Sequence, residues 1–481
     1  MESSRLVGGP ASAPPAPSSG GGGSSMDTIL NVVNIAFGAG MLGLPYAIQG
    51  SGFVSGIFGM GIVLLWNYYC CSLLVELRKE LLLARSNAIK GSPLAAEEGS
   101  PVSFAAVGSY AMGAPGTALV YVSVVVTLLG AATAYFINAN VLLSATHFYL
   151  NPGWSEETAM YANTVIYMCL MYPLTCIKSL APLSKLSFPA IVALVAGFAV
   201  IIKLGLDMFG WPPADEILSW DALYVPQTFE GFSSFFGVAV TRGCHSNVRN
   251  LSGLQCIFRA WQESMADTEE FVGALKTSLW FIWFSYSVLG GIALLIYQQN
   301  GAVSDNIMEE LPPGSAAEEP LLLFITMATL FTYPLAMQPV ASIFEQALIR
   351  AGYGKASTAV GGGYGAVPGT MPSGPPPADT EANGGALPPW LAYGLRAALV
   401  LFTGVCATSV PNFGIVVALL GSFSVTLGSF VLPPLFHFVV FGERMSPMAK
   451  VSDIVLFAVG VVTCVFTTTT TALSVFKEGD P

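Results

Sequence analysis

A short segment near residue 40 combines the residue types that interrupt a helix inside an apolar run. Residues 31–47 read NVVNIAFGAGMLGLPYA, in which Gly38, Gly40 and Gly43 are followed by Pro45. Glycine weakens a helix and proline lacks a backbone N–H, so main-chain polar groups can be left free here. Such groups can hold an ammonium group, a carboxylate or a cation, and a half-helix N-terminus favours a carboxylate. Close packing of neighbouring helices on these glycines is the alternative interpretation.

A second segment has a similar pattern. Residues 229–248 contain Gly231, Gly237 and Gly243, and residues 241–247 read TRGCHSN. Membrane transporters built from inverted repeats place a second broken helix at the corresponding point of the second half, five spans after the first. An Arg and a His are costly on a helix that faces lipid, so this run indicates either a cavity or a displaced span boundary.

The elements that carry these residues must lie in a membrane. The chain has 481 residues, of which 53% are hydrophobic and 10% are charged, whereas soluble domains carry about 25% charged residues. Mean hydropathy is +0.66, and the net charge of -11 argues against a nucleic-acid partner, which requires clustered cations. The composition therefore excludes soluble enzymes, nucleic-acid binders and disulfide scaffolds, and the eight cysteines are interpreted as small buried hydrophobes.

Apolar runs long enough to cross a hydrocarbon core of about 30 Å recur along the chain. The sequence predicts an all-α polytopic membrane protein with eleven transmembrane helices, at 27–49, 53–76, 116–149, 158–178, 185–209, 229–248, 271–297, 319–349, 388–410, 411–437 and 447–475. Residues 1–25 are rich in Pro, Gly and Ser and are expected to be a disordered cytosolic tail. Residues 350–389 are expected to be a low-complexity cytosolic loop.

The basic residues predict how the helices are oriented. With a cytosolic N-terminus and eleven spans, thirteen of the eighteen Lys and Arg residues lie on the cytosolic side. This asymmetry follows the positive-inside rule and places the C-terminus on the non-cytosolic side.

Four stretches together resemble one family. They are NIAFGAGMLGLPYA at 34–47, YPLTCIKSLAPLSKLS at 172–187, FTYPLAMQPV at 331–340 and VPNFGIVVALLGSFSVTLGSFVLPPLFHF at 410–438. In this order they resemble the amino acid/auxin permease family of the amino acid, polyamine and organocation superfamily. The resemblance covers residues 26–477 as an amino acid transporter transmembrane domain. It implies a LeuT-type fold of two inverted five-helix repeats plus one extra helix, and amino acid transport coupled to a proton or sodium gradient.

One region departs from the family pattern. Residues 241–261 read TRGCHSNVRNLSGLQCIFRAW, which is longer and more basic than the corresponding stretch of the family. A misread exon boundary or an insertion is one interpretation of this segment, and a binding-site role for His245 is another.

Candidate site residues follow from the pattern and from the resemblance. The broken segment is expected to bind substrate through its backbone, and the resemblance implies that Asn34 coordinates a cation, with a helix-to-helix hydrogen bond as the alternative. Tyr135 is a candidate donor to the substrate carboxylate, with packing as the alternative. The full set is Gly38, Ala39, Gly40, Met41, Leu42, Tyr135 and Gly243 for substrate, and Asn34 and Thr332 for the ion.

Two functions from different classes are compatible with these features. The first is a secondary active transporter, working by symport or antiport, of small neutral amino acids in a vacuolar, lysosomal or plasma membrane. The second is a sensor of the same fold that binds an amino acid without moving it. No catalytic constellation, metal site or cofactor motif is expected, the only ligands being substrate, coupling ion and lipid. His437 is interpreted as an interfacial imidazole, and no carboxylate stands out as a buried proton carrier. The sequence does not fix the oligomeric state.

Overall fold

The structure is a computed structural model of the whole chain. It describes Ile29, Val33 and residues 39–88, 102–145, 155–177, 181–218, 228–229, 231–240, 268–304, 306–310, 318–354, 387–409 and 413–478. Within these ranges the chain forms helices and turns and no strand. Each of the eleven predicted segments contains at least one helix.

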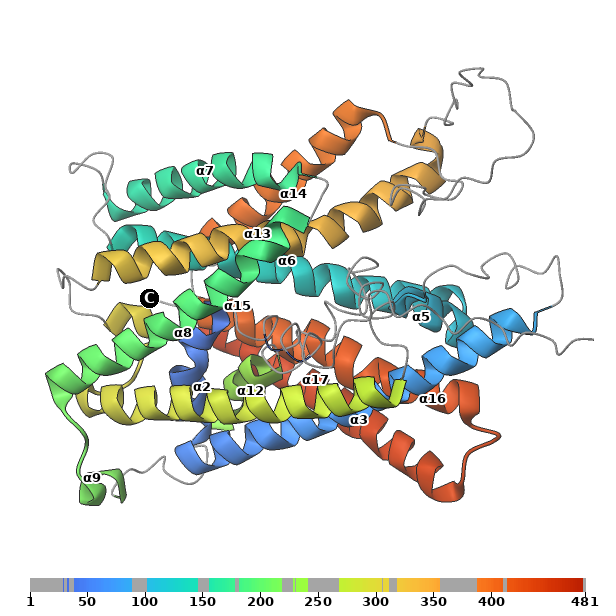
Figure 1. Cartoon of the computed structure of the whole chain (residues 1–481), viewed down its shortest axis with the longest axis horizontal. Helices are drawn as coiled ribbons and strands as arrows, with labels where there is room; N and C mark the ends of the chain where they lie inside the picture. The colour runs from blue at the N-terminus through green and yellow to red at the C-terminus, as the bar shows by residue number, and fades with distance from the viewer. Residues whose placement is uncertain are drawn as a thin grey trace, which may run out of the picture.

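Long helices run along the long axis of the molecule, some in one direction and some in the other (Figure 1). They are α3 (Phe53–Ser86), α6 (Ala114–Ala145), α7 (Glu156–Thr175), α8 (Ala181–Phe209), α12 (Thr268–Tyr297), α13 (Glu318–Leu348), α14 (Pro389–Ser409) and α17 (Pro447–Glu478). Six helical stretches are long and apolar enough to cross a membrane: 53–86, 114–140, 272–297, 389–409, 414–441 and 447–473. The chain is thus a multi-pass membrane protein, and a total of eleven crossings stays a prediction.

Shorter elements lie between these helices. They are η1 (Ala39–Gly43), α2 (Leu44–Ser51), α5 (Phe104–Met112), α9 (Ala214–Leu218), η2 (Gln298–Asn300), η3 (Ile307–Glu310) and the helix Gly231–Val240. The sequence analysis did not predict α5, α9 or η3, because elements this short leave no membrane-length apolar run. At the start of α5, Ser103 accepts a hydrogen bond from the N–H of Ala106 at 3.1 Å, which satisfies one of the free donors of a helix N-terminus.

The predicted tenth span is not a uniform α-helix. It runs through α15 (Phe413–Leu420), the two π-helical turns η5 (Gly421–Val425) and η6 (Leu427–Val431), and α16 (Leu432–Phe441). The Ser123 hydroxyl of α6 donates to the carbonyl oxygen of Ser424 at 2.8 Å. A neighbouring helix therefore satisfies a backbone group within the π-helical stretch, where the ordinary α-helical bonding pattern is interrupted.

The helices pack as two groups. The first group is α2, α3 and α12, and the second group is α6, α7, α13 and α14. Helix α8 contacts α12 on one side and α13 on the other, while α16 contacts α3, α5 and α17. The two groups lie on opposite sides of the molecule in Figure 1.

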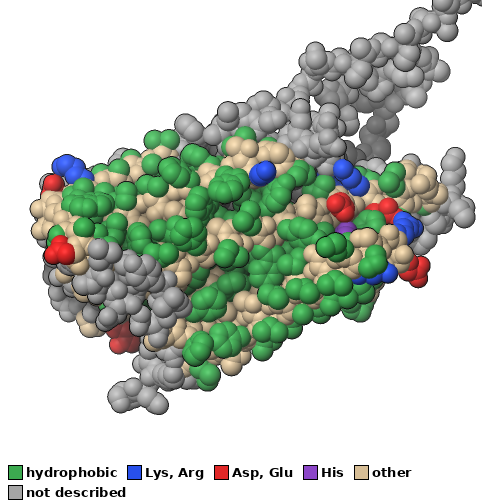
Figure 2. Space-filling model, turned by 90° about the horizontal axis from the view of Figure 1, so that it is seen from below, with side chains coloured by type: hydrophobic (Ala, Val, Ile, Leu, Met, Phe, Trp, Pro, Cys, Tyr) green, Lys and Arg blue, Asp and Glu red, His purple; other side chains and the backbone are tan. Residues whose placement is uncertain are grey.

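Apolar side chains cover most of the face drawn in Figure 2, and most charged side chains lie toward its two ends. Many large hydrophobic side chains on the long helices are exposed, among them Phe58, Phe284, Phe402, Val462 and Leu473. Exposed apolar side chains in this number are unfavourable in water. They are compatible with the hydrocarbon core of a bilayer, with the charged side chains at its two surfaces.

Candidate functional site

The glycine-rich segment breaks α-helical geometry where the sequence predicts a break. Residues Ala39–Gly43 form a 3-10 turn, and the α-helix α2 begins only at Leu44 with Pro45 in its first turn. No side chain caps this N-terminus, and η1 runs directly into α2 between Gly43 and Leu44. Met41 and Leu42 are fully buried and anchor the turn in the core.

This turn, η1, lies at the junction of the two helix groups. It is continuous with α2 of the first group and contacts α13 of the second group and η3. Gln49, near the end of α2, accepts a hydrogen bond through Oε1 from the N–H of Val303 at 3.0 Å. The segment that leads into η3 is therefore tied to α2 just beyond the break.

A buried asparagine pair joins that segment to α6. The side-chain amide of Asn306 donates through Nδ2 to Oδ1 of Asn138 at 3.0 Å, and both side chains are fully buried. The Nδ2 group of Asn138 is buried and has no hydrogen-bond partner among the described residues. A buried, unsatisfied amide donor is costly, which makes it a candidate to bind an anionic group. The sequence analysis missed Asn138, although a polar residue inside the apolar stretch AYFINAN is the signal that marks it.

The second predicted broken segment begins next to α2. A Cβ at Gly231 would lie 2.3 Å from the carbonyl oxygen of Gly50, so the two backbones touch and only glycine fits. A Cβ at Gly237 would lie 2.1 Å from the carbonyl oxygen of Ala418 in α15. The helix Gly231–Val240 is thereby held between α2 and α15, while residues 241–261 lie outside the described residues.

Helix α13 contacts η1, and its Tyr333 packs among side chains of α6 and α14. The Tyr333 hydroxyl lies 2.8 Å from Oγ1 of Thr403 in α14. The Tyr333 ring packs edge-on against Phe136 of α6 with 5.2 Å between centroids. Pro334 lies within the helix and cannot bond the carbonyl of residue 330. Thr332 is half-buried next to these groups.

The predicted site residues divide into two sets. Ala39, Gly40, Met41 and Leu42 form η1, Thr332 lies on α13, and Tyr135 is buried on α6 one turn before Asn138. Residues three apart share one helix face, so Tyr135 and Asn138 are on the same side of α6. Asn34, Gly38 and Gly243 lie outside the described residues.

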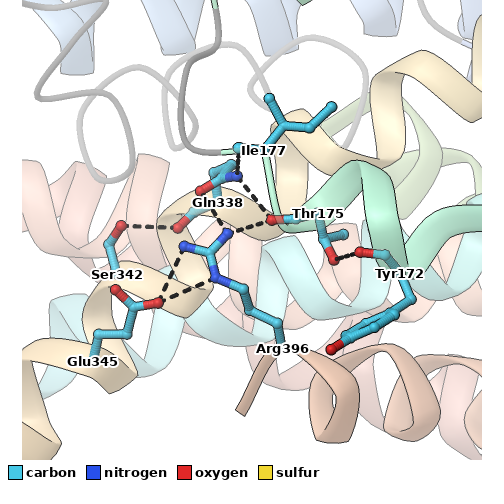
Figure 3. Close-up of polar contacts among 7 residues, drawn as sticks. All are labelled: Tyr172, Thr175, Ile177, Gln338, Ser342, Glu345 and Arg396. Atoms are coloured by element: carbon cyan, nitrogen blue, oxygen red, sulfur yellow. Dashed lines mark hydrogen bonds and ion pairs between the residues drawn. The ribbon is translucent and has the colours of Figure 1, made fainter. Parts of the chain in front are cut away.

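A polar cluster around Arg396 lies within the second helix group (Figure 3). Arg396 of α14 donates to Oε1 of Glu345 in α13 from Nε at 3.2 Å and from Nη2 at 3.1 Å. Its Nη1 also donates to the carbonyl oxygen of Thr175, which ends α7, and to Gln338. The Gln338 amide in turn donates to the carbonyl oxygens of Thr175 and Ile177. The last carbonyl of α7, that of Thr175, is thus bound by a buried cation from α14 and an amide from α13.

A second cluster corrects two sequence-based interpretations. His437 of α16 is 7% exposed and is not an interfacial imidazole, because its ring lies between Asp453 of α17 and Glu76 of α3. Asp453 is 1% exposed and is the buried carboxylate that the sequence analysis did not identify. Its position six residues into an apolar helix hides it, since hydropathy alone does not tell which face of the helix is buried.

The sequence as a whole matches one family profile, described as "Transmembrane amino acid transporter protein", over residues 21–473. Among its relatives in Arabidopsis thaliana is amino acid transporter ANT1, 25% identical over 454 residues, with 94% of this chain and 93% of the relative covered. Amino acid transporter AVT3C from the same plant is 26% identical over 468 residues, covering 94% of this chain and 92% of the relative.

Solved structures show the same fold at low sequence identity. MhsT in complex with L-phenylalanine superposes with a TM-score of 0.50 at 12% identity, covering 93% of this chain and 98% of MhsT. The inward-facing conformation of Mhp1 superposes with a TM-score of 0.51 at 14% identity, covering 99% of this chain and 96% of Mhp1. Both have the LeuT fold, and the described helices have a LeuT-like arrangement.

Proposed function

Because this chain belongs to the transmembrane amino acid transporter family, we propose that it is a secondary active transporter of small neutral amino acids, driven by a proton or sodium gradient. Alternating access would come from movement of the first helix group against the second around the broken segments. The proposed location is a vacuolar, lysosomal or plasma membrane, with a cytosolic N-terminus and the C-terminus on the other side. This function is transport and not catalysis.

The observation that carries this proposal is the 3-10 turn η1 at the junction of the two groups. Gly38 and the residues of η1 would bind the ammonium and carboxylate groups of the substrate through free main-chain groups. The uncapped start of α2 favours a carboxylate, because the N-terminus of a helix carries partial positive charge. A substrate bound at the junction touches both groups, so its binding affects their relative position.

The side chains of α6 supply a second set of contacts. The free Nδ2 donor of Asn138 and the hydroxyl of Tyr135 are both suited to a carboxylate. Gly243, beyond the described end of the helix Gly231–Val240, is proposed to supply backbone contacts from the second broken segment.

The coupling ion is proposed to bind between the first broken segment and α13. The amide oxygen of Asn34 and the hydroxyl of Thr332 are hard oxygen ligands. The carbonyl that Pro334 leaves without its helical partner adds a third oxygen near Thr332. These ligands suit sodium, whereas proton coupling would need a titratable group instead.

Uptake into proteoliposomes tests the function. The purified chain is reconstituted and supplied with radiolabelled neutral amino acids, first with an imposed proton gradient and then with a sodium gradient. Accumulation that depends on one of the gradients is expected and identifies the ion. Binding without accumulation would contradict transport and favour a sensor.

A matched pair of glycine substitutions tests the site. Gly40→Val places a branched side chain where backbone must approach the substrate, so uptake is expected to fall to background while the protein still reaches the membrane. Gly394→Val is the control, because a Cβ at Gly394 of α14 meets nothing within 4 Å, and it is expected to keep normal uptake. Full activity of Gly40→Val would overturn the assignment of η1 as the substrate site.

A further inference from the structure

The ring of His437 lies between two carboxylates from two other helices. Its Nδ1 is 2.6 Å from Oδ2 of Asp453 in α17, and its Nε2 is 3.2 Å from Oε2 of Glu76 in α3. The Asp453 side chain is fully buried, whereas the Glu76 side chain is 60% exposed. One side of the cluster is therefore closed off, and on the other side Glu76 lies at the surface of the protein.

The His437 ring can donate a hydrogen bond to each carboxylate only when both of its nitrogens carry a proton. A neutral imidazole has one N–H, so one of its two nitrogens would present a lone pair to a carboxylate oxygen. The imidazolium donates from both nitrogens and places a positive charge between two negative ones. Oδ1 of Asp453 is buried with no hydrogen-bond partner among the described residues, so the neutral state would leave that carboxylate still less compensated. Only a ring with both N–H groups can donate to both carboxylates at once.

The helices that pack against α16, which are α3, α5 and α17, carry other charged and titratable groups. Helix α3 contributes Glu80, which pairs with Arg444 at 2.8 Å, and the Cys70 thiol, which is electrostatically coupled to Asp453. Further groups of these elements include Arg78 and Lys79 on α3, Glu443 in the turn after α16, Lys450 on α17 and Tyr110 on α5. The ring nitrogens themselves face Glu76 and Asp453.

The cluster adds polar contacts where α3 already packs against α16. Helix α3 belongs to the first group, whereas α16 contacts α17 and α5, and α5 packs against α6 of the second group. The ring bridges α3 to α16 and α17 near the end of the bundle where α3 ends and α17 begins (Figure 1). A contact of this kind opposes separation of the two groups at that end.

We propose that His437, Asp453 and Glu76 form a proton-binding site that clasps α3 to α16 and α17. With a proton bound, the clasp holds this end of the bundle together and slows the conformational step of transport. When the ring loses its proton, one of the two contacts is lost, α3 is released and the step becomes faster. This regulation rests on the proposed transport function, but the proton site and the clasp can be tested without it.

Proton binding is tested directly by nuclear magnetic resonance on labelled histidine in nanodiscs. The chain has three histidines, so the His437→Gln variant identifies the signal. Asp453→Asn removes the nearer carboxylate, and the pH dependence of the His437 signal is expected to differ from that of the unsubstituted chain. Glu76→Gln is expected to give a smaller shift because that carboxylate is exposed. A titration unchanged in both variants would overturn the site.

The clasp is tested by spin labels at two exposed positions, Leu83 on α3 and Met448 on α17, in a chain whose reactive cysteines are replaced. The distance distribution is expected to broaden as the pH is raised and to be broad at every pH in His437→Gln and Glu76→Gln. Glu80→Gln is the matched control: it lies one turn from Glu76, breaks a neighbouring ion pair and is expected to keep the pH response. A distribution that does not respond to pH would overturn the clasp.

The effect on transport is measured as amino acid exchange at equal pH on both sides, so that no proton gradient contributes. Exchange is expected to become several-fold faster as the pH rises, and His437→Gln is expected to be fast throughout. Glu80→Gln is expected to retain the normal profile. The same pH profile in His437→Gln and the unsubstituted chain would overturn the regulation. If no variant exchanges substrate at any pH, the transport proposal fails, and the spin-label distances still decide whether the clasp exists.

Discussion

The Arg396 and His437 clusters differ in charge and connectivity. Arg396 carries a permanent charge and is compensated by Glu345, Gln338 and a helix-end carbonyl within the second group. His437 carries a charge only when protonated, and it joins α3 to α16 and α17. A permanent ion pair suits a region that stays together, whereas a titratable ion pair suits a contact that must open.

Removing Arg396 is expected to have the largest effect on stability. In Arg396→Leu the buried end of the Glu345 carboxylate loses its partner and the Thr175 carbonyl keeps only the Gln338 amide, at a cost of about 3 kcal/mol or more. The apparent Tm in detergent should fall by the same amount at about pH 6 and pH 8, since the cluster contains no imidazole.

Arg396→Lys sharpens this prediction. Lysine keeps the charge but lacks the planar fork that bonds Glu345 and Thr175 together, so an intermediate Tm is expected. A Tm of Arg396→Leu equal to that of the unsubstituted chain would show that this cluster does not hold the second group together.

Substitution of His437 is expected to have a smaller effect that depends on pH. The charged ring stabilises the folded state through two charge-assisted contacts, so His437→Gln should lower stability by about 1–2 kcal/mol at low pH. The loss should shrink as pH rises and the unsubstituted ring gives up its proton. Thermal unfolding at a series of pH values measures this, and a loss that is constant with pH would remove the contrast between the two clusters.

The smallest effect is expected at the neighbouring surface pair of Arg444 and Glu80. Arg444 is 72% exposed in its side chain, and exposed ion pairs contribute about 0–1 kcal/mol. Glu80→Gln should leave Tm almost unchanged at every pH. A large loss here would mean that any ion pair at this end of the bundle stabilises it, and that proton binding is not what distinguishes His437.

Local sequence was sufficient to predict the positions of the long helices and of the first broken segment. Apolar runs set the positions of the long helices, because a hydrocarbon core requires a fixed length of apolar chain. Gly40, Gly43 and Pro45 set the departure from α-helical geometry at η1, because backbone conformation depends on the residue itself. The basic residues and the family motifs added an orientation and a family, and the family is confirmed.

The partners of the buried polar groups depended on the tertiary structure. Glu345 and Arg396 are 51 residues apart, and Glu76 and His437 are 361 residues apart. The hydrophobic periodicity of a helix indicates which of its faces is buried, but it does not indicate which distant helix packs against that face. The same holds for Gly50 and Gly231, whose backbones touch, and for Asn138, whose free donor is apparent only once Asn306 is in place.

The sequence by itself thus determined that the chain is helical, lies in a membrane and breaks its first span near residue 40. Those properties arise from the transfer of apolar segments into lipid and from the backbone preferences of glycine and proline, which act over a few residues. Tertiary structure alone decided that Arg396 has a permanent partner within one group and that His437 lies between two carboxylates across the bundle. Ion pairs and hydrogen bonds act over a few ångströms, so they depend on which helices pack together and in which register.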